Sequence, residues 1–355
     1  MSAERKTLFP SSSARDISAA DCYSALDRCF GELKPDVVAI PGWSAPASLM
    51  ALLWCGNHGI PRILMSESNQ WDEPRNPFKE WVKGRMVACY DAALVGGQSH
   101  LEYLQQLGMQ AAVISKGYDA VDNTHFYRDA DAPHSVDDSY FLASARFIEK
   151  KNLGELIEAF STYRREAASK GLPVWALTIL GDGPLRGQLE KRITELGLED
   201  VVRLPGFIQY ADLPAWYHGA GAFIHASETE QWGLVVNEAM AAGLPVLVSR
   251  KCGCAGELVS PGTNGYLMDP GQKEQMVSLM LKMSSLPETA RHEMGEQSRR
   301  IVDGWGVGRF AKGMLSAVDV CTGENATGIG MTDRALIHLL AMRPRSWQQR
   351  DAAQT

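Results

Sequence analysis

Two glutamates eight positions apart are the strongest candidates for chemistry in this sequence. Glu230 lies in a polar loop after the apolar run Phe223–His225, and Glu238 lies in the helix-like segment Gly233–Ala242. The amides around Trp232–Val235 would occupy the start of that helix, where unpaired N–H groups and the helix dipole favour a diphosphate. Glu238 could then accept hydrogen bonds from the vicinal hydroxyls of a ribose, and Glu230 could hold a sugar near its anomeric carbon. The alternative is two ordinary surface carboxylates, since the surface is the default location of this residue type.

Two cations and a glycine-rich turn follow other apolar runs. Arg146 ends the sequence ASAR after the run Tyr140–Ala143, and Lys151 follows five residues later. At a strand exit, a guanidinium and an ammonium can together clamp a diphosphate. A pair of solvated surface cations is an equally good interpretation. The turn GDGP at 181–184 follows the run Ala176–Leu180 and would let backbone approach a ligand closely, although a plain turn is the simpler interpretation.

Short apolar runs alternate with longer helical patterns along the chain, and this order predicts parallel sheets covered by helices. The runs are nearly continuous, as in sheets that are buried on both faces. The predicted strands are Val37–Pro41, Arg62–Met65, Ala92–Val95, Ala112–Ser115, Tyr140–Ala143, Ala176–Leu180, Val201–Leu204, Ala222–His225 and Pro245–Ser249. The predicted helices include Ala19–Leu33, Ala45–His58, His100–Leu107, Leu153–Ser169 and Leu185–Leu196. Ligands of such sheets bind beyond the carboxyl ends of the strands, which is where Arg146 and Glu230 stand.

Composition and charge exclude several other classes of protein. The chain has 355 residues, 45% hydrophobic and 22% charged, which suits a globular protein of about two domains and excludes a disordered one. Its net charge of −7 argues against nucleic acid as a partner. Seven scattered cysteines, an odd number, indicate reduced thiols in a cytosol. We find no signal-peptide pattern and no apolar run long enough to span a membrane, so we expect a cytoplasmic protein.

Five segments in a fixed order resemble the retaining glycosyltransferases of family 4, which have the GT-B fold. They are ASARFIEKKNLGELIEAF, ILGDGP, VRLPGF, SETEQWGLVVNEAMAAGLPVLVS and NGYLMDP, and they lie between residues 140 and 270. The resemblance implies two Rossmann-like lobes whose parallel sheets face a central cleft. It also implies a retaining, metal-independent hexosyltransferase. Such an enzyme moves a sugar from a nucleoside-diphosphate sugar to an acceptor hydroxyl of a glycan, a lipid or a small molecule.

The matching positions carry implied roles. Arg146 and Lys151 match the pair that binds the donor diphosphate. Glu230 matches the acid that positions the transferred sugar, and Glu238, the second acid of the E-x7-E motif, matches the one that binds the nucleotide ribose. The turn at 206–208 matches one whose backbone lies near the base. The predicted catalytic residues are Glu230, Arg146 and Lys151, and the predicted donor-binding residues are Glu238, Trp232, Gly233, Leu234, Val235, Gly206, Phe207 and Ile208, with no metal and no cofactor beside the nucleotide-sugar co-substrate.

The motifs also divide the chain. We expect an acceptor-side lobe with a linker at 1–136, a nucleotide-sugar-binding lobe at 137–312, and a helical tail at 313–355 that crosses back to the first lobe. The boundary rests on the polar segment YRDADAPHSVDD at 127–138. The first lobe lacks about one βα unit in length, where the first strand and its glycine-rich loop would be. A non-catalytic GT-B-like protein that binds nucleotide or glycan is therefore the alternative.

Three weaker signals have simpler interpretations. Asp129-Ala130-Asp131 is a D-x-D motif, but it lies in the linker and not beside a strand, so turn chemistry is favoured over manganese binding. Cys252-Gly253-Cys254 has no second Cys or His pair nearby, which favours a turn over a metal site. The segment 78–86 combines aromatic residues with lysine and arginine, so a weak peripheral contact with the inner face of a membrane is one interpretation. A solvated helix face is the other, and it is favoured.

Overall fold

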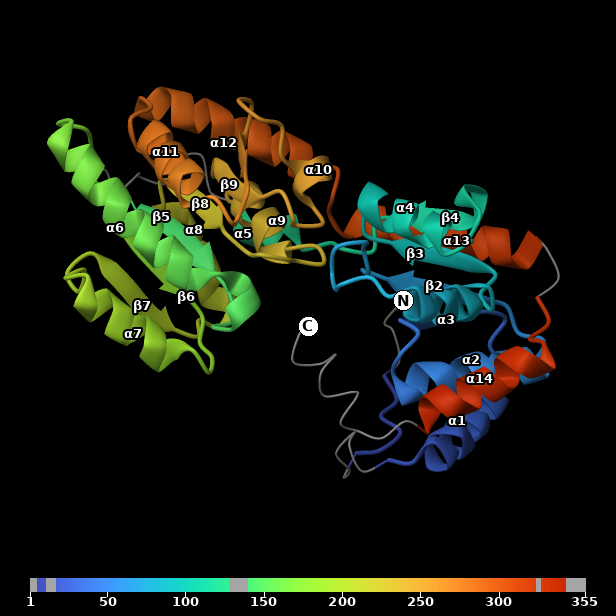
Figure 1. Ribbon diagram of the computed structural model, residues 1–355. Coiled ribbons are helices and arrows are strands. Elements are labelled where there is room, and N and C mark those ends of the chain that lie inside the picture. Colours follow the sequence, from blue (N-terminus) through green and yellow to red (C-terminus); the bar gives the residue numbers. More distant parts are fainter. Residues whose placement is uncertain (1–4, 11–16, 128–139, 324–326, 343–355) are drawn as a thin grey trace. The chain divides into compact units, whose positions relative to one another are not determined.

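A computed structural model describes residues 5–10, 17–127, 140–323 and 327–342 of the chain (Figure 1). The chain forms two compact units. Unit 1 consists of Met1–Val95, His100–Tyr118 and Ala311–Thr355, and unit 2 consists of Gly96–Ser99 and Asp119–Phe310. Each unit contains one parallel sheet with helices packed against it. The predicted fold class, α/β with parallel sheets in two lobes, is confirmed.

The described part of unit 1 has a four-stranded parallel sheet in the order β1-β2-β3-β4. Neighbouring strands are also consecutive in the chain, so each connection moves the chain by one position across the sheet. The elements are α1 (Ala19–Leu33), β1 (Val38–Pro41), α2 (Pro46–His58), β2 (Arg62–Ser66), α3 (Pro77–Val87), β3 (Ala92–Val95), α4 (Gln98–Gln106), η1 (Ala111–Val113), β4 (Ile114–Lys116), α13 (Val307–Gly323) and α14 (Met331–Ala341). Helix α13 begins in unit 2 and continues into unit 1.

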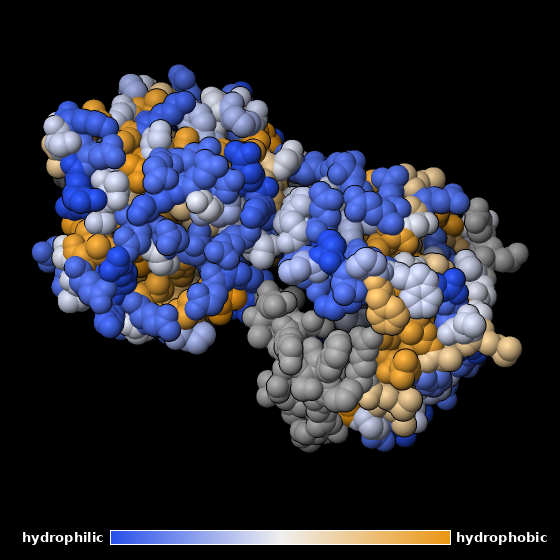
Figure 2. Space-filling view, viewed as in Figure 1, coloured by the Kyte–Doolittle hydropathy of each residue, from blue (hydrophilic) through white to orange (hydrophobic). Residues whose placement is uncertain are grey.

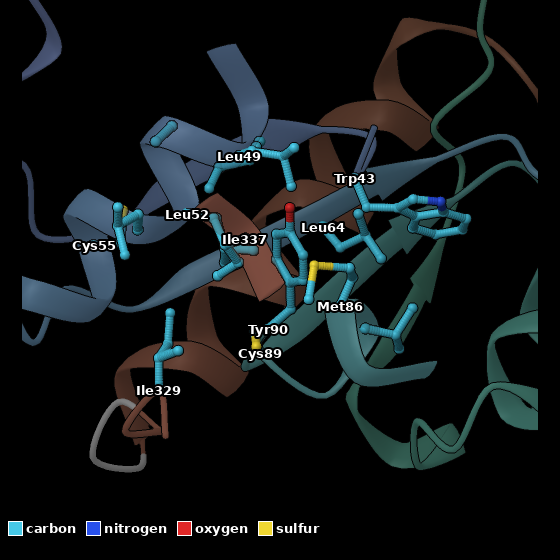
Figure 3. Close-up of a cluster of buried hydrophobic side chains, with 14 of the residues drawn as sticks. Trp43, Leu49, Leu52, Cys55, Leu64, Met86, Cys89, Tyr90, Ile329 and Ile337 are labelled. Atoms are coloured by element: carbon cyan, nitrogen blue, oxygen red, sulfur yellow. The ribbon is translucent and has the colours of Figure 1, made fainter. Parts of the chain in front are cut away.

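Helix α2 lies at the centre of the unit 1 core. Its sequence is apolar on nearly all sides, which is the pattern of a helix that is buried all round. Leu49, Leu52 and Cys55 of this helix are completely buried. They belong to the same cluster as Leu64 of β2 and Ile337 of α14 (Figure 3). The carboxy-terminal helix α14 therefore completes the core around the first strands.

The described part of unit 2 has a six-stranded parallel sheet in the order β10-β9-β8-β5-β6-β7. Its elements are α5 (Asn123–Phe126), β5 (Tyr140–Ser144), η2 (Glu149–Lys151), α6 (Leu153–Ser169), β6 (Ala176–Leu180), α7 (Arg186–Glu195), β7 (Val202–Gly206), η3 (Tyr210–Asp212), α8 (Leu213–Gly219), β8 (Ala222–His225), α9 (Leu234–Ala241), β9 (Val246–Ser249), α10 (Ala255–Leu258), β10 (Gly265–Met268), α11 (Lys273–Ser284) and α12 (Glu288–Asp303).

Successive residues of the strands in unit 2 face opposite helix layers, as the pleat of a β-strand requires. Phe141 and Ala143 of β5 pack in one cluster with residues of α6 and α11. Leu142, which lies between them, packs in a second cluster with residues of α9. Both faces of the sheet are thus buried, which explains why its strands are nearly continuous apolar runs.

The strand order of unit 2 reverses direction at β5. From β5 the chain adds β6 and then β7 on one side, and it returns to place β8 on the other side of β5. Open α/β sheets bind their ligands beyond the carboxyl ends of the strands at such a reversal. Lys151 follows β5 and Glu230 follows β8, so the fold carries both side chains to this edge.

Two strand predictions differ from the structure. Within the predicted strand Ala112–Ser115, the first two residues belong to the 3-10 helix η1, because the Val113 amide turns back to the Gln110 carbonyl at 3.2 Å. Strand β4 therefore begins only at Ile114. The apolar pattern also did not predict β10, a strand of four residues of which two are only partly buried.

The contacts of the chain also divide it into units. The boundary predicted after residue 136 lies outside the described residues, as does Asp129-Ala130-Asp131. By its contacts, the chain belongs to unit 2 at Gly96–Ser99, leaves unit 1 again after Tyr118 and returns to it after Phe310. Residues 119–127 thus belong to unit 2, because the completely buried Phe126 packs in one of its clusters.

Candidate functional site

The loop after β8 is fixed to a second loop at the same edge of the unit 2 sheet. The amide of Glu230 donates to the carbonyl of Lys251 at 3.1 Å, and the carbonyl of Glu230 accepts from the amide of Gly253 at 3.0 Å. These two bonds form a short parallel bridge between Glu230 and Cys252. Because hydrogen bonds hold both the amide and the carbonyl of Glu230, the backbone from which its side chain projects is fixed.

Two cations hold the Glu230 carboxylate. It forms an ion pair with Nζ of Lys151, and its Oε2 lies 3.3 Å from Nε2 of His225. The side chains of the three residues are only 13%, 10% and 3% exposed, respectively. At this degree of burial, water screens the charges poorly, so removal of one partner leaves an uncompensated charge in a poorly solvated place.

The charges of this cluster shift its pKa values. Burial by itself would raise the pKa of Glu230, but the hydrogen bonds and charges of His225 and Lys151 outweigh burial and hold that pKa well below its usual range. Burial by itself would lower the pKa of His225, but hydrogen bonds and charges from Cys252 and Glu230 raise it to about 9. These shifts favour an ionised Glu230 and a protonated His225.

Helix α9 begins directly beside this cluster. Gly233 precedes the helix with φ +100°, and a Cβ there would lie 2.6 Å from Sγ of Cys252 and 3.4 Å from Cγ of Glu230. The amides of Leu234 and Val235 have no hydrogen-bond partner among the described residues. They are the free N–H groups of a helix start, and an anion at this end of α9 could accept from them.

The side chains of Glu238 and Trp232, two of the predicted donor-binding residues, are buried to different degrees. Glu238 is partly buried, accepts from the hydroxyl of Tyr217 at 2.6 Å through Oε2, and has its pKa raised by burial. Trp232 is 1% exposed, and its indole nitrogen donates to Asn237 at 2.9 Å. The Trp232 side chain is therefore part of the core, and only its backbone can contribute to a ligand site.

The exits of β5 and β6 are joined backbone to backbone. The amide of Phe147 donates to the carbonyl of Asp182 at 2.9 Å. Gly181 has φ +117°, and a Cβ on it would lie 1.9 Å from the carbonyl oxygen of Ala145. The glycine-rich turn thus serves close packing between two loops, and it supports the loop that carries Arg146, whose side chain is exposed.

The turn at 206–208 stands at the next strand exit. Gly206 ends β7 with φ +94°, and its carbonyl accepts from the amide of Gly181 at 2.9 Å. Phe207 is 72% exposed, whereas Ile208 packs partly against a core cluster. The turn at 206–208 therefore lies beside the glycine-rich turn at 181–184. Lys151 and Glu230 are two predicted site residues that the fold brings into direct contact.

Two members of the cluster were not predicted as site residues. His225 ends a buried strand, so in the sequence it resembles a core position, and its place at a strand end was the only signal of a role. Cys252 was interpreted as part of a turn, yet its Sγ donates to the carbonyl of Trp232 at 2.8 Å and lies 3.5 Å from Sγ of Cys254. In the described part of the chain, no group of three or more His, Cys, Asp or Glu side chains could hold a metal ion.

The surface gives little support to the membrane interpretation of segment 78–86. Nζ of Lys83 pairs with Glu73 at 2.6 Å, and the Arg85 guanidinium pairs with Asp333 at 2.6 Å, so acids of unit 1 neutralise these cations. Trp81 is 56% exposed. Figure 2 shows hydrophilic residues spread over the visible surface, with apolar areas between them. Among the described residues, no helix has the length and apolar character needed to cross a bilayer.

The charge cluster predicts an unusual dependence of stability on pH. The raised pKa of His225 stabilises the fold below its usual 6.5, and this contribution is lost as the pH rises towards 9. The lowered pKa of Cys252 stabilises the fold above its usual 9.0, and this contribution is lost as the pH falls. Between pH 6.5 and 9.0, the folded protein holds one proton on His225 and none on Cys252, whereas the unfolded protein holds one proton on Cys252 and none on His225. The two dependences therefore cancel in the wild type.

Cys252→Ala should remove this cancellation. In the variant, the hydrogen bond and charge of Glu230 still raise the pKa of His225, so the free energy of unfolding of the variant should fall as the pH rises above 6.5. Urea midpoints of wild type and variant, measured across this range, test the expectation. A variant as flat as the wild type would contradict a protonated His225.

Part of the sequence is similar to known glycosyltransferases. Residues 128–301, just under half of the chain, match the family model of the glycosyl transferases group 1. The alpha-monoglucosyldiacylglycerol synthase of Acholeplasma laidlawii is 31% identical over 152 residues, which are 43% of this chain and 36% of the relative. The chain spans only about a third to a half of the length of the first curated relatives.

The comparison of structures extends beyond the matched segment. A sucrose-phosphate synthase from Thermosynechococcus elongatus superposes with a TM-score of 0.72 at 18% identity, covering 86% of this chain and 79% of the other. The Anabaena protein HepE in complex with UDP superposes with a TM-score of 0.71 at 18% identity, covering 84% and 81%. At this identity the likeness establishes the fold, and the fold of the chain is that of the GT-B glycosyltransferases.

Proposed function

We propose that the protein is a retaining glycosyltransferase of family 4 that transfers a hexose from a nucleoside-diphosphate sugar to an acceptor hydroxyl. The observation that carries the proposal is the buried pair of Lys151 and Glu230 at the reversal point of the unit 2 sheet. The family match over residues 128–301 and the GT-B fold support it. The nucleotide sugar is a co-substrate, and the proposal includes no cofactor.

Each residue of the site has a role in this proposal. Lys151, Arg146 and the amides of Leu234 and Val235 bind the diphosphate and stabilise the charge that develops on it as the glycosidic bond breaks. This set of cations and amides takes the place of a metal ion. Glu230, fixed by its backbone bridge, orients the sugar and holds the Lys151 ammonium in place. The Glu238 carboxylate binds the ribose, and the turn at 206–208 lies near the base.

Retention of the anomeric configuration is part of the proposal. Glu230 is already bound to two cations, so its lone pairs are poorly available for covalent attack on a sugar. Attack of the acceptor hydroxyl on the same face from which the diphosphate leaves is consistent with this arrangement. The acceptor is a glycan, a lipid or a small molecule.

The seven cysteines are free thiols, which agrees with a cytoplasmic location.

Nucleotides should stabilise the folded protein in a base-dependent way. We expect UDP to raise the melting temperature more than GDP or ADP, because HepE, whose fold the chain shares, was solved with UDP. A ligand at about one hundred times its Kd adds roughly 2.7 kcal/mol of stability. A thermal melt with each nucleotide and its sugars measures this. The Lys151→Ala variant serves as the control for binding at the proposed site.

The melts also separate the proposal from its alternative. A larger shift with GDP or ADP would correct the base and leave the rest of the proposal intact. No shift with any nucleoside diphosphate would contradict the proposal as a whole. Binding without turnover of any nucleotide sugar, with or without acceptors, would instead support a GT-B-like binding protein.

A further inference from the structure

Two cysteines lie directly behind the Glu230 cluster. Sγ of Cys252 is 3.5 Å from Sγ of Cys254, and the two residues are 1% and 0% exposed. Gly253 separates them, so they stand in one loop after β9. This separation of the sulfur atoms exceeds a disulfide bond length by only about 1.5 Å. A small movement of this loop would therefore bring the sulfur atoms to bonding distance.

The cysteine loop is bonded to the loop that carries Glu230. Besides the backbone bridge at Glu230, the amide of Cys254 donates to the carbonyl of Trp232 at 3.1 Å. Sγ of Cys252 lies 2.8 Å from the same carbonyl oxygen, to which it donates in its thiol form. Cys252 also contacts Gly233 at the start of α9, where a Cβ would be 2.6 Å from its sulfur. Any displacement of Cys252 is thus transmitted to both ends of the Glu230 loop.

The surroundings of Cys252 favour a reactive thiol. Burial by itself would raise its pKa, but hydrogen bonds from Cys254 and His225 and the charge of His225 outweigh burial and lower it. By contrast, burial raises the pKa of the thiols of Cys22, Cys55, Cys89 and Cys321. The thiolate is the form of cysteine that attacks peroxides, so Cys252 should react before these four.

We propose that Cys252 and Cys254 form a peroxide-sensitive dithiol that closes to a disulfide and thereby displaces Glu230. The Cys252 thiolate attacks one oxygen of hydrogen peroxide, and the sulfenic acid of Cys252 and hydroxide result. The Cys254 thiol then attacks that sulfur, the S–S bond forms, and the hydroxyl leaves with the Cys254 proton as water. In sum, two thiols and one peroxide give one disulfide and two waters.

Closure of the disulfide changes the site in two ways. It breaks the contact of the Cys252 sulfur with the Trp232 carbonyl, and it removes the negative charge that the Cys252 thiolate places beside His225. Both changes act on the residues that fix Glu230. If the proposed function holds, on which this consequence rests, a shift of about 1 Å in the reacting groups should lower turnover roughly tenfold or more.

The disulfide itself can be tested without any activity. The folded wild-type protein is treated with hydrogen peroxide, blocked with iodoacetamide, digested and mapped by mass spectrometry. We expect the peptide that contains both cysteines to lose two hydrogen atoms and to resist alkylation until it is reduced. Cys29→Ser should behave as the wild type does. An alkylated, unoxidised Cys252–Cys254 peptide after exposure to millimolar peroxide would overturn the proposal.

The coupling to the site needs a second readout. Peroxide should inhibit UDP binding and turnover of the wild type, and a reductant should restore them. Cys254→Ala should have the same basal UDP binding and turnover, but peroxide should not inhibit them. If the disulfide forms but UDP binding and turnover stay unchanged, the proposed coupling to Glu230 is wrong. If no nucleotide binds and no sugar is transferred under reducing conditions, the proposed function fails, and the dithiol is still judged by the peptide map and by the change in melting temperature on oxidation.

Discussion

Replacement of Glu230 by Gln is expected to lower sugar transfer by about 100-fold or more, since the amide cannot hold the Lys151 ammonium or orient the sugar as the carboxylate does. It should also destabilise the protein by about 3–5 kcal/mol, because two buried cations lose their common counter-charge. Turnover with the best nucleotide sugar and the urea midpoint give the two quantities. Glu228→Gln, an exposed carboxylate of the same loop, is the matched control and should leave both near the wild-type values.

The stability loss and the activity loss of Glu230→Gln can be separated. In the double variant with Lys151→Met, the Lys151 charge is removed together with its partner, so part of the lost stability should return. Transfer should stay as low as in the single variant, since neither the diphosphate nor the sugar is held. Recovery of transfer together with stability would show that Glu230 acts only through folding.

Gly181→Ala should strongly damage the fold at the carboxyl edge of the unit 2 sheet. The new Cβ would lie 1.9 Å from the carbonyl oxygen of Ala145, on a residue with φ +117°. Neither backbone can move without breaking the bonds between the exits of β5 and β6. We expect a loss of roughly 3 kcal/mol or more, from overpacking and a strained backbone together.

Gly187 provides the control for this substitution. It lies six residues later, is exposed in helix α7, and has open space where a Cβ would be. Gly187→Ala should leave the protein unchanged or stabilise it by up to about 1 kcal/mol, as alanine does in a helix. Equal urea midpoints for the two variants would contradict the close contact between the loops.

The sequence predicted several strands well because nearly all of their residues are buried on both faces of the sheet. The runs Ala92–Val95, Ala176–Leu180 and Ala222–His225 match β3, β6 and β8 residue for residue. Strand β4 and its preceding turn were harder, since short apolar side chains suit either conformation. The boundary between the units depends on which cluster Phe126 joins, and the pattern of the sequence does not contain that information.

The site was predictable in its motifs but not in its contacts. The E-x7-E motif and the strand exits pointed to Glu230 and Lys151, and the fold brings these two side chains together. The contacts of His225 and Cys252 depend on the order of the strands, which places the ends of β8 and β9 side by side. Local patterns carry no signal for that order, so the charges behind Glu230 became visible only in the structure.

Calorimetric titration of UDP into the wild type and into Lys151→Ala tests the central claim most directly, because it measures diphosphate binding at the proposed residues without needing the acceptor. We predict measurable binding to the wild type and a Kd that Lys151→Ala weakens by about 10- to 100-fold, as expected for the loss of a hydrogen bond between charged groups. Absence of binding, or binding that Lys151→Ala leaves unchanged, would contradict the account.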